Sequence, residues 1–315
     1  MQVSIIIAYH NEGQAFINET VKQIRETADL TDYEIIIVDD HSGRKIDMPG
    51  AKIVRHAQNH GVGRAFDTGA HYAKSDNLII MGSDIRFIAN NWMSKLVAAT
   101  EANPKSLICT SCVALNESKP QGMDIEYRRG INMRSGASLL ARYNASKKPG
   151  KVKHMSILAA QWLPLDRKQK GVIEVPVILG AIYGVKKEWY QYIDGFAGHR
   201  VWGTLEPLIS IKSYMFGGNC LCHKDVETGH IFRVKSTHGV TQENVYYNKL
   251  WAAMILFDNP LRDRLISALP NNRHVEAAKK LIDKQRATNK HNEYKAKAVL
   301  SGAKTLERMK ASYKN

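Results

Sequence analysis

Three aspartates directly follow apolar runs that we interpret as buried strands. Asp39 and Asp40 close the run at 33–40, and Asp84 closes the run at 77–84. Strands of a parallel sheet present their carboxyl ends at one edge, where such sheets bind ligands. Hard divalent cations take oxygen ligands and bind readily beside phosphates. We therefore expect a metal or phosphate site at this edge. The alternative, for one of the first two acids, is a cap on the turn that contains Ser42.

The elements that must position these acids alternate along the first 115 residues. Continuous apolar runs indicate parallel strands covered on both faces, and apolar residues at helical spacing separate them. This alternation predicts an α/β fold with a doubly wound, mostly parallel sheet flanked by helices. We expect strands at 3–9, 33–40, 51–57, 77–84 and 106–115, with helices at 11–27, 61–75 and 90–103.

The rest of the chain is less regular. Residues 117–171 are polar, basic and weakly periodic, which is typical of an insertion or a loop region. Strand and helix patterns return at 172–193, and helical patterns dominate from about residue 244. We predict a main domain over 1–258, with a basic insertion at about 117–171, and a basic helical extension over 259–315.

The net charge of +15 comes from two segments of the sequence. Residues 261–315 hold 14 Lys/Arg against 5 Asp/Glu, and residues 119–153 hold 9 against 2. Two basic segments on a balanced body favour a polyanionic partner, such as nucleic acid, an anionic membrane surface or a charged polymer. The alternative is a solvated basic helix at the carboxyl end.

Membrane and export signals are not evident in the sequence. No apolar run approaches the ~18–20 residues that cross a bilayer. The chain starts with a strand-like segment rather than an export signal. Cysteine spacing alone allows a zinc site, but the run at 107–115 is typical of a strand interior, which favours reduced core thiols. We expect a cytoplasmic protein, in the host cytoplasm if a phage encodes it. The four cysteines are Cys109, Cys112, Cys220 and Cys222.

Seven motifs, in a shared order, resemble family 2-type glycosyltransferases of the GT-A fold. The pattern is most similar to the catalytic domain of polypeptide N-acetylgalactosaminyltransferases, over roughly residues 3–258. The lectin domain and disulfides of that family's exported members are not evident. The motifs are VSIIIAYHNE (3–12), EIIIVDDHS (34–42), GVGRAFDTGAHYAKSDNLIIMGSD (61–84), GAIYGVKKEWYQYIDGF (180–196), WGTLEPLISIKSYMFGG (202–218), ETGHIFR (227–233) and NKLWAAMILFD (248–258).

The resemblance implies a nucleotide-sugar donor, with UDP as the expected nucleotide. Tyr9 would pack on the base, Glu12 would reach the ribose and Asp40 would accept the uracil N–H. His199 and Arg200 would contact donor phosphate or acceptor. Small residues at 180 and 181 would let the backbone approach the sugar. The residues implied for the donor are Ala8, Tyr9, Glu12, Asp39, Asp40, Arg64, Ser83, Gly180, Ala181, Trp202 and Arg200.

A divalent metal, Mn or Mg, is implied by the same resemblance. The family ends its fourth strand with D-x-D or D-x-H, and the matching triplet here is Gly82-Ser83-Asp84. The first acid is missing, so Asp84 is the remaining ligand, and His230 matches the family's second protein ligand. Such a metal neutralises the leaving diphosphate as a Lewis acid. The missing acid puts the family's sugar contact in doubt.

Glu206 is the expected catalytic residue. It follows the W-G segment that flanks the acceptor site, where inverting relatives place an acid that deprotonates the acceptor hydroxyl. The retaining N-acetylgalactosaminyltransferases usually have asparagine at this position. Glu206 therefore favours direct displacement, although a glutamate before a proline is also a common charge at a helix start.

Three acceptor classes fit the sequence. A hydroxymethylated base in phage DNA would use the basic segments 119–153 and 261–315 as contacts to duplex phosphates, and an extruded base would present a primary alcohol. A cell-surface polysaccharide or lipid-linked glycan would place the basic tail on a membrane, but the tail has few apolar anchors. A protein acceptor follows from the resemblance. The charge favours DNA.

Overall fold

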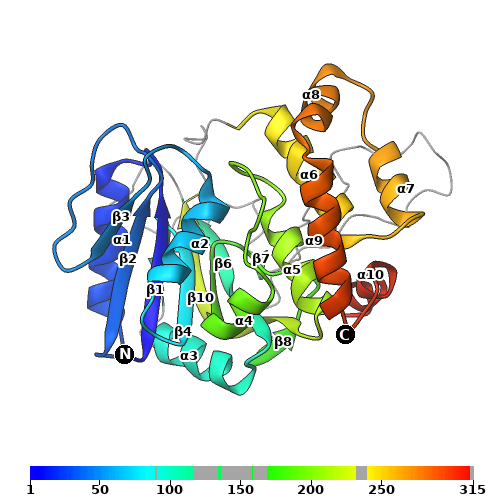
Figure 1. Cartoon of the computed structure of the whole chain (residues 1–315). Helices are drawn as coiled ribbons and strands as arrows, with labels where there is room; N and C mark the ends of the chain where they lie inside the picture. Colours follow the sequence, from blue (N-terminus) through cyan, green and yellow to red (C-terminus); the bar gives the residue numbers. More distant parts are fainter. Residues whose placement is uncertain (89–90, 116–133, 136–157, 159–168, 232–239, 313–315) are drawn as a thin grey trace.

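The fold is built on one mixed sheet whose first half is parallel. The computed structural model describes residues 1–88, 91–115, 134–135, 158, 169–231 and 240–312. Within them the main strand order is β3-β2-β1-β4-β9-β6-β10-β5 (Figure 1). The first four are parallel to one another, as predicted. Their bounds are β1 Val3–Tyr9, β2 Tyr33–Asp39, β3 Lys52–Arg55 and β4 Asn77–Gly82.

The second half of the sheet is mixed and comes from distant parts of the chain. β9 is antiparallel to both β4 and β6, whereas β10 is parallel to β6 and antiparallel to β5. Two short strands lie off this path, β7 beside β6 and β8 beside β10. The bounds are β5 Ile85–Phe87, β6 Ser106–Leu115, β7 Arg134–Ser135, β8 Val172–Glu174, β9 Ile182–Lys186 and β10 Asn219–Ile231.

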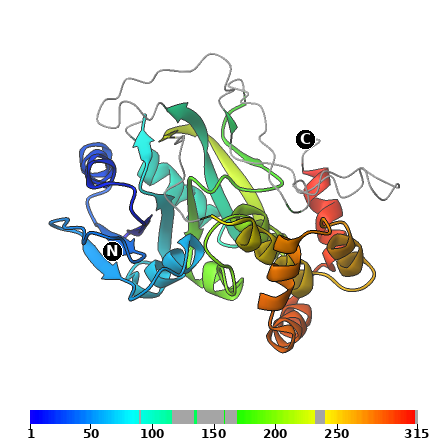
Figure 2. The ribbon, with the colours of Figure 1, turned by 90° about the horizontal axis from the view of Figure 1, so that it is seen from above.

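Helices cover both faces of the sheet and form a hydrophobic cluster on each. Alternate residues of β1 belong to different clusters, Ile5 and Ile7 to one and Ile6 to the other. This double burial explains why β1 is a continuous apolar run. Seen from above, helices lie on both sides of the sheet (Figure 2). The first cluster contains α1 Gln14–Thr27 and α3 Trp92–Ala102, and the second contains α2 Val62–Tyr72, α4 Lys187–Tyr192 and α5 Leu205–Met215.

The carboxyl-terminal helices gather beside α5, away from β3 (Figure 1). Ala287, Tyr294 and Leu306 of this extension are buried in the larger of the two clusters. The predicted boundary at 258/259 therefore divides the sequence, whereas the hydrophobic core continues across it. The helices are α6 Gln242–Leu256, α7 Leu261–Ser267, α8 Arg273–Leu281, α9 Lys284–Lys297 and α10 Gly302–Ala311.

Several cations of the extension contact acids of this same chain. Lys290 pairs with Asp194, Lys295 with Asp258, and Arg308 with Glu174. These contacts join the basic helices to the body of the protein and reduce the number of cations available to a partner. The predicted insertion at 117–171 lies outside the described residues, apart from 134–135, 158 and 169–171.

The four cysteines are buried and free, two on β6 and two on β10. The prediction of reduced core thiols is therefore confirmed. Among the residues that the structure describes, no group of three or more His, Cys, Asp or Glu side chains is arranged to hold a metal ion. Within that same part of the chain, no helix combines the length and apolarity needed to cross a membrane.

Candidate functional site

A cavity of about 300 Å³ opens where β1 and β4 end. Most of the residues predicted for the donor and the metal line it, although they come from six separate parts of the chain. Its size lies at the lower end of the usual range for ligand sites, roughly 300–1,000 Å³. The predicted residues in its wall are Ala8, Tyr9, Glu12, Asp40, Ser83, Asp84, Gly180, Ala181, Trp202, Glu206 and His230.

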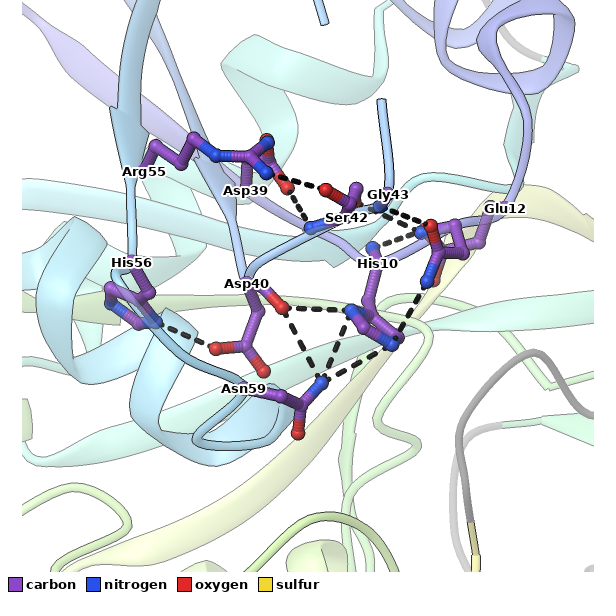
Figure 3. Close-up of polar contacts among 10 residues, drawn as sticks. His10, Glu12, Asp39, Asp40, Ser42, Gly43, Arg55, His56 and Asn59 are labelled. Atoms are coloured by element: carbon purple, nitrogen blue, oxygen red, sulfur yellow. Dashed lines mark hydrogen bonds and ion pairs between the residues drawn. The ribbon is translucent and has the colours of Figure 1, made fainter. Parts of the chain in front are cut away.

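Asp39 has a structural role and does not line this cavity. Its side chain is fully buried, accepts the Ser42 backbone N–H at 2.8 Å and pairs with Arg55 (Figure 3). Both carboxylate oxygens therefore have partners from the turn after β2 and from β3. This geometry corrects the expectation that Asp39 contacts the nucleotide, and it realises the turn-capping alternative for this residue.

Asp40 organises the loop that leads into α2. Its carboxylate accepts from His56 Nδ1 at 2.7 Å and from the backbone N–H groups of His60 and Gly61 at 2.8 and 2.6 Å. Burial disfavours the charged form, but these hydrogen bonds and the nearby His56 outweigh it and lower the pKa of Asp40. The carboxylate thus fixes the loop around His60 at the start of α2.

His10 is a polar residue of this wall that was not predicted from the sequence, and it contacts Asn59, which lines a second cavity. His10 lines the cavity, and its Nδ1 lies 2.7 Å from the Asp40 backbone carbonyl (Figure 3). Asn59 Nδ2 lies 3.1 and 3.2 Å from the two ring nitrogens of His10. The signal for His10 was its position between Tyr9 and Glu12, whereas Asn59 has no sequence signal of its own.

Asp84 and His230, the two residues expected to bind the metal, lie next to each other at the cavity edge. β5 pairs with β10 in a register that places His230 opposite Ile85, next to Asp84. Asp84 Oδ1 and His230 Nε2 are 3.4 Å apart. Adjacent ligand atoms of an octahedral ion with bonds of about 2.1 Å lie about 3 Å apart, so the pair fits a divalent cation with small adjustments.

Gly82 provides the space that the Asp84 carboxylate occupies. A Cβ built on Gly82 would lie 2.8 Å from Asp84 Oδ1, which is closer than side-chain contacts allow. The missing acid of the family triplet and the position of Asp84 are therefore linked. An aspartate at residue 82 would force the carboxylate of Asp84 to move.

Glu206 lies in the first turn of α5 and lines the cavity. Burial raises the pKa of its carboxyl group, while the backbone N–H of Glu206 itself partly offsets this. A Cβ on Gly180 would lie 2.7 Å from Glu206 Oε1. The small residue at 180 therefore makes room for the glutamate. Glu206 is also the acidic residue at the start of α5, which was the alternative explanation for it. This position is compatible with a catalytic role as well.

The segment before α5 adopts backbone conformations that side chains rarely take. Val201 and Thr204 have φ of +50° and +65°, and such conformations persist only where the surroundings impose them. The Asn248 side chain of α6 supplies that constraint. Its Oδ1 accepts the Arg200 N–H at 2.9 Å, and its Nδ2 donates to the carbonyls of Arg200, Trp202 and Gly203.

Besides Asp39, three predicted contacts of the donor do not face this cavity. Arg64 and Arg200 line a second cavity on the other side of the segment before α5. His199 is buried and donates from Nε2 to the Gly203 carbonyl at 2.6 Å, and burial lowers its pKa to about 4. A neutral, enclosed imidazole corrects the expectation that His199 contacts phosphate or acceptor.

A family comparison agrees with the fold and the strand-end acids. The sequence profile described as "Glycosyl transferase family 2" matches residues 4–163, just over half of the chain. The chain belongs to this family. The match covers β1 to β6 and includes Asp40 and Asp84, but it ends before Glu206 and His230.

The curated relatives of the chain are longer proteins. "Probable N-acetylgalactosaminyltransferase 6" of Caenorhabditis elegans is 26% identical over 307 residues, which cover 88% of this chain and 47% of the relative. "Polypeptide N-acetylgalactosaminyltransferase 10" of Homo sapiens is 24% identical over 296 residues, 90% of this chain and 46% of the relative. The chain thus spans about half the length of the curated relatives it matches.

Solved structures share the fold. The crystal structure of GalNAc-T7 with UDP, GalNAc and Mn²⁺ has a TM-score of 0.67 at 19% identity, with 93% of this chain and 55% of that chain covered. The structure of Staphylococcus aureus TarS 1-349 in complex with UDP-GlcNAc has a TM-score of 0.50 at 14% identity, with 93% and 80% covered. These similarities confirm the predicted GT-A fold.

Proposed function

We propose that this protein is a metal-dependent glycosyltransferase that moves a sugar from a UDP-sugar to an acceptor hydroxyl. One observation carries the proposal. The Asp84–His230 pair, at 3.4 Å, and the Glu206 carboxylate line the same cavity at the carboxyl end of β1 and β4. Solved structures with this fold contain UDP, UDP-GlcNAc and Mn²⁺, which supports the choice of donor and metal.

The residues of the cavity divide into donor and metal contacts. Tyr9, Glu12 and Asp40 line the part formed by β1 and the loops after β1 and β2, where we assign the nucleoside. Asp84 and His230 would hold Mn²⁺ or Mg²⁺, which when bound neutralises the leaving diphosphate. Gly180 and Ala181 line the part that faces Glu206, where we assign the sugar.

We assign Glu206 as the general base for the acceptor hydroxyl. Its carboxylate takes the hydroxyl proton as the acceptor oxygen bonds to the anomeric carbon and the bond to the diphosphate breaks. A pKa raised by burial brings a carboxylate closer to the operating pH, which strengthens it as a base. The product of this single displacement is inverted at the anomeric carbon.

For the acceptor we propose a hydroxymethylated base in DNA, because the chain carries a formal charge of +15. The ion pairs that α9 and α10 form with the body of the protein reduce the positive charge that residues 261–315 can offer to DNA. Nearly all of 119–153 lies outside the described residues. A protein hydroxyl is the second candidate, supported by the names of the polypeptide-modifying relatives.

Mass spectrometry separates these acceptors. Hydroxymethylated-base DNA and a serine- and threonine-rich peptide are each incubated with a panel of UDP-sugars and Mn²⁺. The proposal predicts the mass increase of one sugar on the DNA, none on the peptide, and none on either with Glu206→Gln. Modification of the peptide alone would replace the DNA acceptor with the second candidate. No transfer from any UDP-sugar to either acceptor would contradict the proposed function.

A further inference from the structure

A second, larger cavity lies on the other side of the segment before α5. Its volume is about 920 Å³, and its wall combines α2, residues 190–201, α6 and the start of α9. Three exposed arginines from three different elements line it, Arg64 of α2, Arg200 and Arg286 of α9. We refer to this space as the arginine cavity. It takes in the two arginines that the sequence predicted for the donor.

The guanidinium groups of the arginine cavity are available to a ligand. Among the described residues, none of the three guanidinium groups forms an ion pair with a carboxylate. Two are held over aromatic rings instead, Arg200 at 5.0 Å above Tyr247 and Arg286 at 5.3 Å above Trp251. Stacking on a ring orients a guanidinium while its N–H groups remain free to donate, often two at a time to one oxyanion.

The two stacked arginines are held on one face of one helix. Tyr247 and Trp251 are one turn apart on α6, and their rings are nearly parallel, with an interplanar angle of 6° and centroids 6.4 Å apart. Both rings are buried, at 5% and 1% exposure, so they are fixed in place. The guanidinium groups above them are therefore positioned before any ligand arrives, which lowers the entropic cost of binding.

The carboxylates in the wall are occupied by the protein. Asp67 accepts from the Tyr190 hydroxyl and the Phe196 N–H, and Asp194 accepts from Lys290 and Tyr294. Asp283 caps α9 by accepting the Arg286 backbone N–H at 3.0 Å. Asp283 is an exposed carboxylate of the arginine cavity, and the three exposed arginines outnumber it.

The backbone segment that separates the two cavities contributes neighbouring residues to both. Val201 lines the arginine cavity, while its neighbour Trp202, 45% exposed, lines the cavity that holds Glu206. Val201 also pairs with Gly61 of the loop that Asp40 holds. A chain-like acceptor that crosses Trp202 can therefore place one group beside Glu206 and the next in the arginine cavity.

We propose that the arginine cavity binds a backbone phosphate of the nucleic-acid acceptor. This inference rests on the proposed function, because it assigns the phosphodiester beside the modified base. Arg200 and Arg286 donate to the phosphate oxygens, and Arg64 adds positive charge from α2. The cavity thereby favours a base within a polynucleotide over the same base as a free nucleoside.

Binding is tested with a fluorescent 16-base-pair duplex that contains no hydroxymethylated base, by anisotropy at several KCl concentrations. The test variant is Arg200→Gln/Arg286→Gln. The matched control is Lys74→Gln/Lys105→Gln, which removes the same charge from two exposed residues. These residues precede β4 and β6, whereas the first cavity lies at the carboxyl end of β4. Loss of one phosphate contact reduces the slope of log K against log[salt] by about 1.

We expect the test variant to bind the duplex at least tenfold more weakly, with a slope shallower by about 1 because one phosphate contact is lost, and the control to keep the wild-type slope. Equal losses in both variants would overturn the proposal, because they would show diffuse electrostatics. A poly-glutamate peptide of equal charge serves as the second probe. If it binds as tightly as the duplex and is lost equally in the test variant, the phosphate assignment is wrong. Thermal unfolding shows whether each variant is folded.

A second measurement separates this inference from the proposed function. Sugar transfer by the wild-type protein is compared on a hydroxymethylated oligonucleotide and on the free hydroxymethylated nucleoside, which has no phosphate. The proposal predicts a higher kcat/KM for the oligonucleotide, and the test variant should reduce this preference. Equal kcat/KM values would overturn the proposal that the arginine cavity binds phosphate, but they would be consistent with the proposed glycosyltransferase activity. Duplex binding that depends on both arginines, without transfer to either acceptor, would overturn the proposed function alone.

Discussion

Gly180→Ala tests whether the position of the Glu206 carboxylate controls turnover. The new methyl group would lie 2.7 Å from Glu206 Oε1, 2.9 Å from Cγ and 3.1 Å from Cδ. Ordinary contacts of this kind begin at about 3.4 Å, so the glutamate must shift by roughly 0.5–1 Å. The backbone of residue 180 is outside the left-handed region, so alanine itself introduces no strain there.

The expected consequence is a large loss of rate with a small loss of stability. A misplacement of about 1 Å can cost about 10²-fold in rate, and overpacking costs about 1–3 kcal/mol in the free energy of unfolding. We expect kcat to fall about 10- to 100-fold. UDP release with Mn²⁺, donor and acceptor measures the rate, and urea unfolding measures the stability.

Gly43→Ala is the matched control for this substitution. Its added Cβ would lie 3.7 Å from Asn11 Oδ1, an ordinary contact, and Gly43 does not line the cavity. We expect its rate to remain within twofold of wild type. If Gly180→Ala were folded and equally active, the position of Glu206 would not matter and its assignment as the base would be wrong.

Three further predictions concern the metal site, the segment before α5 and a buried acid. Gly82→Ala should weaken Mn²⁺ binding at least tenfold by displacing Asp84 Oδ1, as measured by titration calorimetry with UDP present; unchanged affinity would refute the link between these residues. Asn248→Ala leaves buried backbone groups without their amide partner, so the free energy of unfolding in urea should fall by about 1–3 kcal/mol, and a loss below about 0.5 kcal/mol would count against the constraint. Burial raises the pKa of Asp67 to about 6, so the folded state binds this proton more tightly and stability falls as pH rises from about 4 through 6. Asp67→Asn keeps both hydrogen bonds to Oδ1 and should remove up to about 3 kcal/mol of that decline. An identical decline in unfolding midpoints from pH 4.5 to 7.5 would contradict this prediction.

The sequence predicted the parallel half of the sheet well because its strands are buried on both faces. β1, β2 and β4 are continuous apolar runs, so their carboxyl ends, and Asp39, Asp40 and Asp84 with them, could be located from the apolar pattern alone. Which of the two acids after β2 caps the turn could not be predicted. The choice depends on Arg55 of β3, which reaches Asp39 only once the two strands pair.

The remaining parts of the site depend on contacts between distant segments. His230 was assigned to the metal only through resemblance, because the antiparallel pairing of β5 with β10 has no local sequence signal. Arg64 and Arg200 were expected to contact the donor. In the structure both line the arginine cavity instead, Arg64 from α2 and Arg200 from the backbone beside Val201. The amide of Asn248 gave no signal, since its partners are backbone groups of a segment more than forty residues away.

The pairing of Asp84 with His230 as metal ligands is the centre of this account, and Mn²⁺ binding tests it most directly. Free Mn²⁺ is measured by electron paramagnetic resonance during titration of the protein with UDP present. We expect one tight Mn²⁺ per chain for wild type and at least tenfold weaker binding for Asp84→Ala and for His230→Ala, with His71→Ala unchanged as the control. Wild-type affinity in both of the first two variants would contradict it.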